Sequence, residues 1–307
     1  MKHKLISAKV IADSVCPKGV RMTTMEIEYP RFILAELNTH RMLSKNSASS
    51  RAIPVKAMHE FIRANPATPV SWGKNQPGMK ANEEVGSSVA TEALQVWNRA
   101  KEDALHWADA LAHKLAIHKQ IANRITEPWM TMKTVISGTE WTNFFHLRNH
   151  PDAQPEIKAL AEAMTVAYTT HLPVPLKPGE WHLPYITTAT YVPTGQLQYF
   201  DENFNQLSLE DAKIISASCC AQVSYRKNDP GFTKAFKIWE QLIENDPVHA
   251  SPIEHQATPM DIDSMCRFEP DTWQPGVSHV SANSDLWSGN LRGWIQHRKL
   301  IRSEAVW

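Results

Sequence analysis

The chain has 307 residues, and its 32 Lys and Arg balance 32 Asp and Glu, which leaves a formal charge of zero. This length suits one large or two ordinary domains with a sizeable core. The balanced charge gives no electrostatic reason to expect a nucleic-acid partner, and without a run of about 18 apolar residues we expect no membrane partner. The N-terminal segment shows no pattern of a cleavable leader, so we expect a cytoplasmic protein.

The four cysteines show no metal-binding or disulfide pattern. Cys219 and Cys220 are adjacent in the sequence and cannot easily bridge each other, and no C-x2-C spacing occurs with Cys16 or Cys266. We therefore expect neither a disulfide framework nor a structural zinc site.

Strand patterns come first along the chain. Residues 4–14 and 21–28 are rich in Val, Ile, Thr and Met with a weak period of two, which predicts two strands. Pro30 then opens a segment that suits a helix of modest length up to about Leu43. Residues 44–50 are rich in Ser and Asn, which prefer backbone hydrogen bonds to helix interiors, so this segment is expected to be a loop.

The longest helical pattern covers residues 83–115. Its apolar residues recur every three or four positions, namely Val89, Val96, Trp97, Ala100, Ala104, Trp107, Leu111 and Leu115. This spacing predicts a helix that packs its apolar stripe into a core. Further helices are predicted near 156–170, 209–217 and 233–245.

Prolines at 173, 175, 178 and 184 make 172–208 the best candidate for a connection. We therefore expect two halves, 1–171 and 209–307. Our interpretation of the whole chain is an α+β fold with a mostly antiparallel sheet covered by long helices.

Residues 39–51 carry the first candidate chemistry. Hydroxyls, loop N–H groups and arginine side chains are the groups that hold a phosphate monoester. The sequence therefore allows a phosphate site here, although a solvated serine-rich loop with an incidental Arg51 remains an alternative.

The same segment resembles the signature of the flavin-dependent thymidylate synthases through the residues His40-Arg41-x2-Ser44-x-Asn46-x2-Ser49-x-Arg51. Thr39 and Ser47 depart from that signature at its first arginine and its glutamate. Long-chain members of the family are similar to this chain in further stretches, such as SWGKNQPGM, HKQIANR, EWTNFF and GEWHLPY. A signature of this length at fixed spacing is specific.

The resemblance implies a nucleotide site in the first half of the chain. It would be formed by Asn46, Ser49, Ser50, Arg51, Arg124 and Arg148. Arg148 would be the catalytic residue, because a fixed cation at the base favours the charge that develops on the uracil ring. A surface arginine without a role is the alternative for this position. Ser137-x-Thr139 stands where the family has a flavin-side Asn-x-Arg.

The second half resembles segments that ordinary family members carry before their signature. These segments are Ala221–Tyr225 and His249-Ala-Ser251-Pro-Ile-Glu254-His255, and a second His-Arg follows at 297–298. We infer a rearranged chain in which the signature helix is repeated within residues 285–307. The resemblance then implies flavin contacts from both halves, by Thr39, His40, Arg41, Asn143, His249, Ser251, His297, Arg298 and Glu304.

Taken together, the resemblance implies a fold like that of the flavin-dependent thymidylate synthases, in a homo-oligomer that is a dimer or a tetramer. The implied reaction is the reductive methylation of dUMP to dTMP, with FAD as cofactor and with NADPH and methylenetetrahydrofolate as co-substrates.

Several alternatives stay open. His249, Glu254 and His255 could ligate a metal, but H-x4-E-H is not an established ligand spacing and Pro252 interrupts it, so we expect no metal site. The second His-Arg could be a chance echo of the first. The departures from the signature also leave room for hydroxymethylation, for dCMP as the substrate, or for a non-catalytic nucleotide-binding paralogue.

Overall fold

The computed structural model describes residues 5–224, 229–302 and 304. Its α-helices are α1 Leu34–Asn38, α2 Val55–Ala64, α3 Ser87–Asp109, α4 Lys119–Ala122, α5 Thr142–Arg148, α6 Pro155–Thr170, α7 Leu209–Ala221 and α8 Phe232–Trp239. Its strands are β1 Ser7–Val15, β2 Arg21–Pro30, β3 Ser44–Ser47, β4 Thr131–Gly138, β5 Val174–Pro175, β6 Thr187–Tyr191, β7 Gln196–Phe200, β8 Gln206–Leu207, β9 Ala257–Pro259, β10 His279–Val280, β11 Leu286–Ser288, β12 Leu291–Arg292 and β13 Trp294–Gln296.

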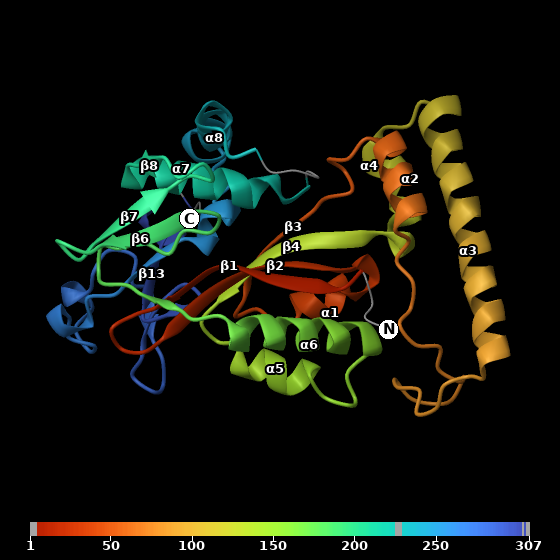
Figure 1. Cartoon of the computed structure of the whole chain (residues 1–307), viewed down its shortest axis with the longest axis horizontal. Coiled ribbons are helices and arrows are strands. Elements are labelled where there is room, and N and C mark those ends of the chain that lie inside the picture. Colours follow the sequence, from red (N-terminus) through yellow and green to blue (C-terminus); the bar gives the residue numbers. More distant parts are fainter. Residues whose placement is uncertain (1–4, 225–228, 303, 305–307) are drawn as a thin grey trace.

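The main sheet has the order β3-β4-β2-β1-β5. All its pairs are antiparallel except β1 with β5. Helices α5 and α6 cover one face, where Ile27 and Ile136 are fully buried (Figure 1). The fold is therefore α+β with a mostly antiparallel sheet and helices packed over it, as the sequence predicts.

The second half of the chain covers the other face of this sheet. Val135 of β4 packs against Cys220 and Val223 at the end of α7. A second core joins Met22 of β2 to Trp294 of β13. The two halves therefore share buried surfaces, which places segments far apart in sequence at the same site.

Two local predictions near the signature differ from the structure. The helix predicted after Pro30 forms, as a 3-10 turn at Arg31–Ile33 that leads into α1, but it ends at Asn38 and does not reach residue 43. Residues 44–47 form β3 instead of a loop, because their backbone completes an edge of the sheet against β4. Tertiary pairing overrides the weak strand propensity of Ser and Asn here.

The prediction that the signature helix is repeated within residues 285–307 is also wrong. Residues 286–296 form strands β11–β13, and only a 3-10 turn, His297–Leu300, follows. Gly289 and Gly293 adopt φ of +59° and +70°, which ends each strand in a turn and is incompatible with a helix. Residues 303 and 305–307 of this segment lie outside the described residues, as does Tyr225.

Helices α3, α6, α7 and α8 confirm the longer helical patterns, but the predicted packing of α3 is only partly confirmed. Trp97 and Ala104 of the predicted stripe pack against the core around Leu105, whereas Val89, Val96, Trp107 and Leu115 are exposed.

Residues 172–208, expected as a connection, carry β5–β8 and bury Trp181 and Leu183 in the shared core. The domain limits at 171 and 209 stay predictions. Across the described parts of the chain, no helix is long and apolar enough to cross a membrane.

Candidate functional site

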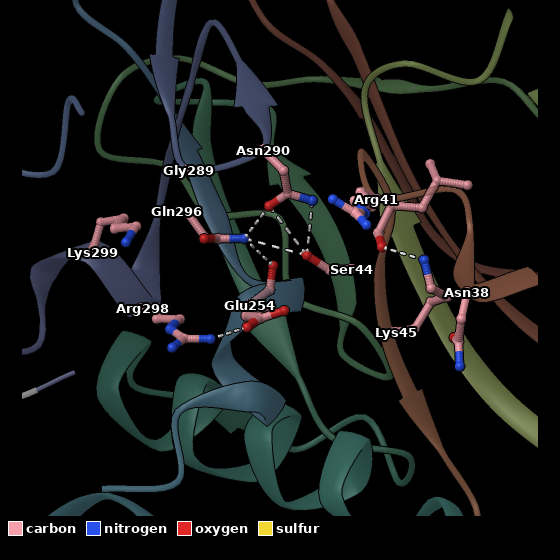
Figure 2. Close-up of a pocket in the computed structure, with 11 residues that line it drawn as sticks. Asn38, Arg41, Ser44, Lys45, Glu254, Gly289, Asn290, Gln296, Arg298 and Lys299 are labelled. Carbon is pink, nitrogen blue, oxygen red and sulfur yellow. Dashed lines mark hydrogen bonds and ion pairs between the residues drawn. The ribbon is translucent and has the colours of Figure 1, made fainter. Parts of the chain in front are cut away.

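A cavity of about 490 Å³ lies between the signature segment and the C-terminal strands (Figure 2). It is lined by polar side chains from both halves of the chain, namely Asn38, Arg41, Ser44, Lys45, Glu254, Asn290, Gln296, Arg298 and Lys299, together with Leu43 and Gly289. The two segments that contain the His-Arg dipeptides therefore meet at one cavity.

Hydrogen bonds donated by the Asn290 side chain hold the two halves together at this cavity, and Gln296 supports Asn290. Asn290 donates to Ser44 Oγ (3.1 Å) and to the Met42 carbonyl (3.1 Å). Gln296 Nε2 donates to Asn290 Oδ1 (3.0 Å) and to the Glu254 carbonyl (3.0 Å). Gly289 leaves room for this arrangement, since a Cβ there would stand 2.8 Å from Gln296 Oε1.

The cavity carries an excess of positive charge. Arg298 pairs with both Glu254 and Glu304, and Glu304 also accepts from Lys299. Arg41 and Lys45 contribute two further cations, so four cationic side chains face two carboxylates. This excess fits a ligand with anionic oxygens, such as a phosphate or diphosphate.

Lys45 is partly desolvated. Its Nζ donates to the carbonyls of His40 (2.5 Å) and Leu43 (2.9 Å). Burial lowers the pKa of Lys45 to about 8, and the nearby Glu254 carboxylate opposes that shift. Lys45 is thus a preorganised cation that bound anionic oxygens would stabilise further.

Arg148 and the first His-Arg form a second group next to the cavity. Arg148 donates from Nε to His40 Nε2 (2.8 Å) and from Nη2 to Thr39 Oγ1 (3.1 Å). The His40 ring also packs edge-on against Phe144. Burial, with the cations Arg148 and Lys45, lowers the pKa of His40 to about 4. His40 is therefore neutral and accepts at Nε2, which fixes the direction of the Arg148 guanidinium.

The loop after β3 forms a third group around Glu127. The Oε1 atom of Glu127 accepts from Ser50 Oγ (2.7 Å) and from Arg124 Nη1 (3.0 Å), and it pairs with Arg31 (3.0 Å). Asn123 Nδ2 donates to the Ser50 carbonyl (2.8 Å). These contacts hold the loop in a fixed shape at the surface, with Arg51 exposed beside it.

Strand β3 separates the cavity from this loop. Ser44 lines the cavity at the start of β3, the strand rises about 10 Å to Ser47, and Ser50 lies in the turn beyond that far end. Between them, Asn46 Nδ2 donates to the Cys220 carbonyl (3.2 Å). Within one chain, the His40-Arg41 end and the Ser49–Arg51 end of the signature therefore do not meet.

The remaining predicted flavin residues lie in different settings. Asn143 on α5 and His249 and Ser251 near the 3-10 turn Ser251–His255 are exposed. His297 is buried: its Nδ1 lies 2.6 Å from Gln256 Oε1, and its ring stacks on Trp239. Burial lowers the pKa of His297 to about 4. His297 is not among the cavity-lining residues, although the next two residues are.

Sequence reasoning missed several members of these groups. Lys45 was available inside the signature, and Glu254 inside the second-half motif. Glu127, Asn290, Gln296 and Lys299 stand in no motif, and their roles depend on contacts between distant segments.

A search of curated proteins found no match. Among solved structures, the UMP/dUMP methylase PolB from Streptomyces cacaoi bound with 5-Br UMP is similar at 18% identity and a TM-score of 0.46, over 54% of this chain and 89% of that one. Its complex with 5-Br dUMP is similar at 16% identity and a TM-score of 0.46, over 54% of this chain and 90% of that one. Thymidylate Synthase X (ThyX) from Helicobacter pylori with FAD and dUMP is similar at 19% identity and a TM-score of 0.33, over 48% of this chain and 67% of that one.

The family comparison covers about half of the chain. The model of the family Thy1, described as thymidylate synthase complementing protein, matches residues 20–174. That range contains the signature, the loop at Ser49–Arg51 and Arg148, and it confirms the resemblance seen in the sequence. The chain belongs to the Thy1 family of thymidylate synthase complementing proteins.

Proposed function

We propose that the chain catalyses the reductive methylation of dUMP to dTMP, with FAD as cofactor and with NADPH and methylenetetrahydrofolate as co-substrates. The observation that carries the proposal is the positively charged cavity between the signature and the second His-Arg, in a chain of the Thy1 family. Two similar structures involve the same ligand classes: PolB is a UMP/dUMP methylase, and ThyX from Helicobacter pylori was solved with FAD and dUMP.

The cavity suits the diphosphate of FAD because cationic hydrogen-bond donors line it. Arg41 and Lys45 would bind phosphate oxygens from one wall, and Arg298, steadied by Glu304, from the other. Thr39, His40, Asn143, His249, Ser251 and His297 are proposed around the same cofactor. When bound, FAD supplies the hydride that completes the methyl group.

The nucleotide is assigned to the loop after β3. Asn46, Ser49, Ser50, Arg51 and Arg124 would hold its phosphate through hydroxyl and guanidinium donors. Arg148 would face the base, with its guanidinium oriented by His40 and Thr39. Because β3 separates this loop from Arg148 within one chain, we propose a homo-oligomer, a dimer or a tetramer, in which copies complete each other's sites.

Incubation with dUMP, FAD, NADPH and methylenetetrahydrofolate tests the reaction. We expect dTMP by mass spectrometry, and a visible flavin spectrum in the purified protein. A hydroxymethylated product, or turnover of dCMP alone, would replace the proposal by one of the related chemistries. A colourless protein that takes up no added FAD would contradict it.

Truncation of the nucleotide arginines should weaken dUMP binding. Each charge-assisted hydrogen bond is worth about 1.5–3 kcal/mol, so Arg51→Ala and Arg148→Ala should each raise the dUMP dissociation constant by about 10- to 150-fold. Calorimetric titration measures this, with Arg63→Ala on the exposed side of α2 as the control. Wild-type affinity in both variants would contradict the assignment of these residues.

A further inference from the structure

Helix α3 presents an apolar stripe to solvent. Val89, Val96 and Trp107 are 52%, 59% and 61% exposed, although they share one side of the helix. Figure 1 shows α3 at the outer edge of the molecule, with α2 and α4 beside it. The stripe thus has no cover among the residues that the structure describes.

A π-helical turn extends the same stripe beyond α3. Residues Ala110–Lys114 form this turn, and Leu115 N donates to the Ala110 carbonyl (3.0 Å), five residues earlier. The wider turn keeps Trp107, Leu111 and Leu115 in one row at intervals of four. Apolar side chains therefore line α3 and its extension over about 40 Å.

The stripe is grooved as well as apolar. A hollow of about 470 Å³ lies along the N-terminal half of α3, and its lining combines Val89, Glu92, Ala93, Val96 and Ala100 with Trp72, Trp97 and Trp129. A second hollow of about 300 Å³ lies along the C-terminal half, with Trp107 in its wall. The exposed Trp107 at one end of the stripe and the mainly apolar hollow at the other make the stripe complementary to a reversed copy of itself.

Charged residues follow one edge of the stripe. Glu92, Arg99 and Asp103 project within about 40° of one another on a helix of 3.6 residues per turn, and Lys114 follows near the far end. When two copies of a helix pair antiparallel about a two-fold axis, the charged edge of one copy lies along the same edge of the other copy, with the chain direction reversed. Arg99 then faces the partner's Asp103, and Glu92 comes within about one turn of the partner's Lys114.

We propose that the α3 stripe, residues 89–115, is the contact surface for α3 of a second copy of this chain, in an antiparallel two-fold pair. The register that places Arg99 opposite the partner's Asp103 also places Trp107 over the partner's hollow at Val96. Charge and shape thus select the same arrangement. A membrane is the other possible partner of an exposed apolar stripe. Cations and anions alternate along this edge, however, so the edge has no net positive charge to attract anionic lipids.

This pairing specifies one face of the oligomer proposed above, but it does not depend on the proposed reaction. A strip about 40 Å long and about 10 Å wide buries about 800 Å² over both partners, which is below the standard size and typical of weak, transient interfaces. We therefore expect an association that strengthens with concentration in the micromolar range.

Sedimentation velocity of the full chain over a micromolar concentration series tests the proposal. Trp107→Glu and Val96→Glu should abolish the concentration-dependent step and halve the limiting mass, with unchanged circular dichroism because both positions are exposed. Val166→Glu, 62% exposed on α6, is the matched control and should behave as wild type. A wild-type chain that stays monomeric throughout, or Glu variants that associate normally, would overturn the proposal.

Charge reversal tests the register. Arg99→Asp and Asp103→Arg should each weaken association by about tenfold, since each removes two symmetric pairs, and the double variant should restore it. Failure of the double variant to recover would overturn the antiparallel register. FAD titration of the same samples separates the two proposals: pairing without flavin uptake leaves the α3 contact standing while the proposed function fails.

Discussion

A chain that ends at residue 285 should fail to unfold cooperatively. Ordinary chain ends tolerate loss, but here the segment after Asp285 supplies core residues. Leu291 and Trp294 are fully buried beside Met22 of β2, and Trp294 Nε1 also donates to the Val20 carbonyl (3.1 Å). Deletion would expose this core and remove β13 from its pairing with β9.

A single substitution reports the same effect without deletion. Trp294→Ala should lower the free energy of unfolding by about 3–5 kcal/mol, because loss of a fully buried indole leaves a cavity and removes its hydrogen bond to the Val20 carbonyl. Val192→Ala, at an 89% exposed site, should change it by less than about 0.5 kcal/mol. Urea denaturation followed by circular dichroism measures both. A truncated chain with the wild-type transition would contradict this account of the C-terminal segment.

The elements that the sequence predicts well are those whose pattern is local. Strands β1 and β2 and helices α3 and α6 follow from the spacing of apolar residues along one segment. Periodicity shows that α3 has an apolar face but not what covers it, so the exposure of Trp107 could not be foreseen.

The failures occur where distant segments decide the structure. Ser44–Ser47 become a strand because β4 offers an edge, and Gly289 and Gly293 turn a helix-like segment into short strands. At the site, the motif identified His40 and Arg148 separately, whereas their hydrogen bond required the fold. Asn290 and Gln296 carry no sequence signal, since their partners come from a segment about 250 residues away or from within the C-terminal half.

The protein should lose stability steeply as pH falls below about 6.5. A buried chain of hydrogen bonds crosses the junction between the two halves and contains two histidines. His182 lies 2.9 Å from Ser14 Oγ and 2.8 Å from Thr24 Oγ1. Thr24 contacts Ser137 (2.6 Å), and Ser137 Oγ lies 2.8 Å from Nδ1 of His255.

Burial lowers the pKa of both His182 and His255 to about 3, against about 6.5 in an unfolded chain. Between these values the unfolded state binds more protons than the folded state, so the free energy of unfolding rises with pH in this window. At pH 5 the loss relative to pH 7.5 is about 2 kcal/mol for each histidine, or about 4 kcal/mol for the pair. His40 and His297, whose pKa values burial also lowers to about 4, act in the same direction.

Urea denaturation at several pH values between 8 and 5 measures this slope, and His182→Gln tests its origin. Glutamine retains a donor and an acceptor for Ser14 and Thr24 but does not titrate. The variant should therefore be less stable than wild type at pH 7.5 yet lose about 2 kcal/mol less on acidification to pH 5. His146→Gln, at an exposed position on α5, should leave the slope unchanged. If stability stays constant down to pH 5, or if His182→Gln keeps the full wild-type slope, then neutral burial of these histidines is not what ties the two halves together.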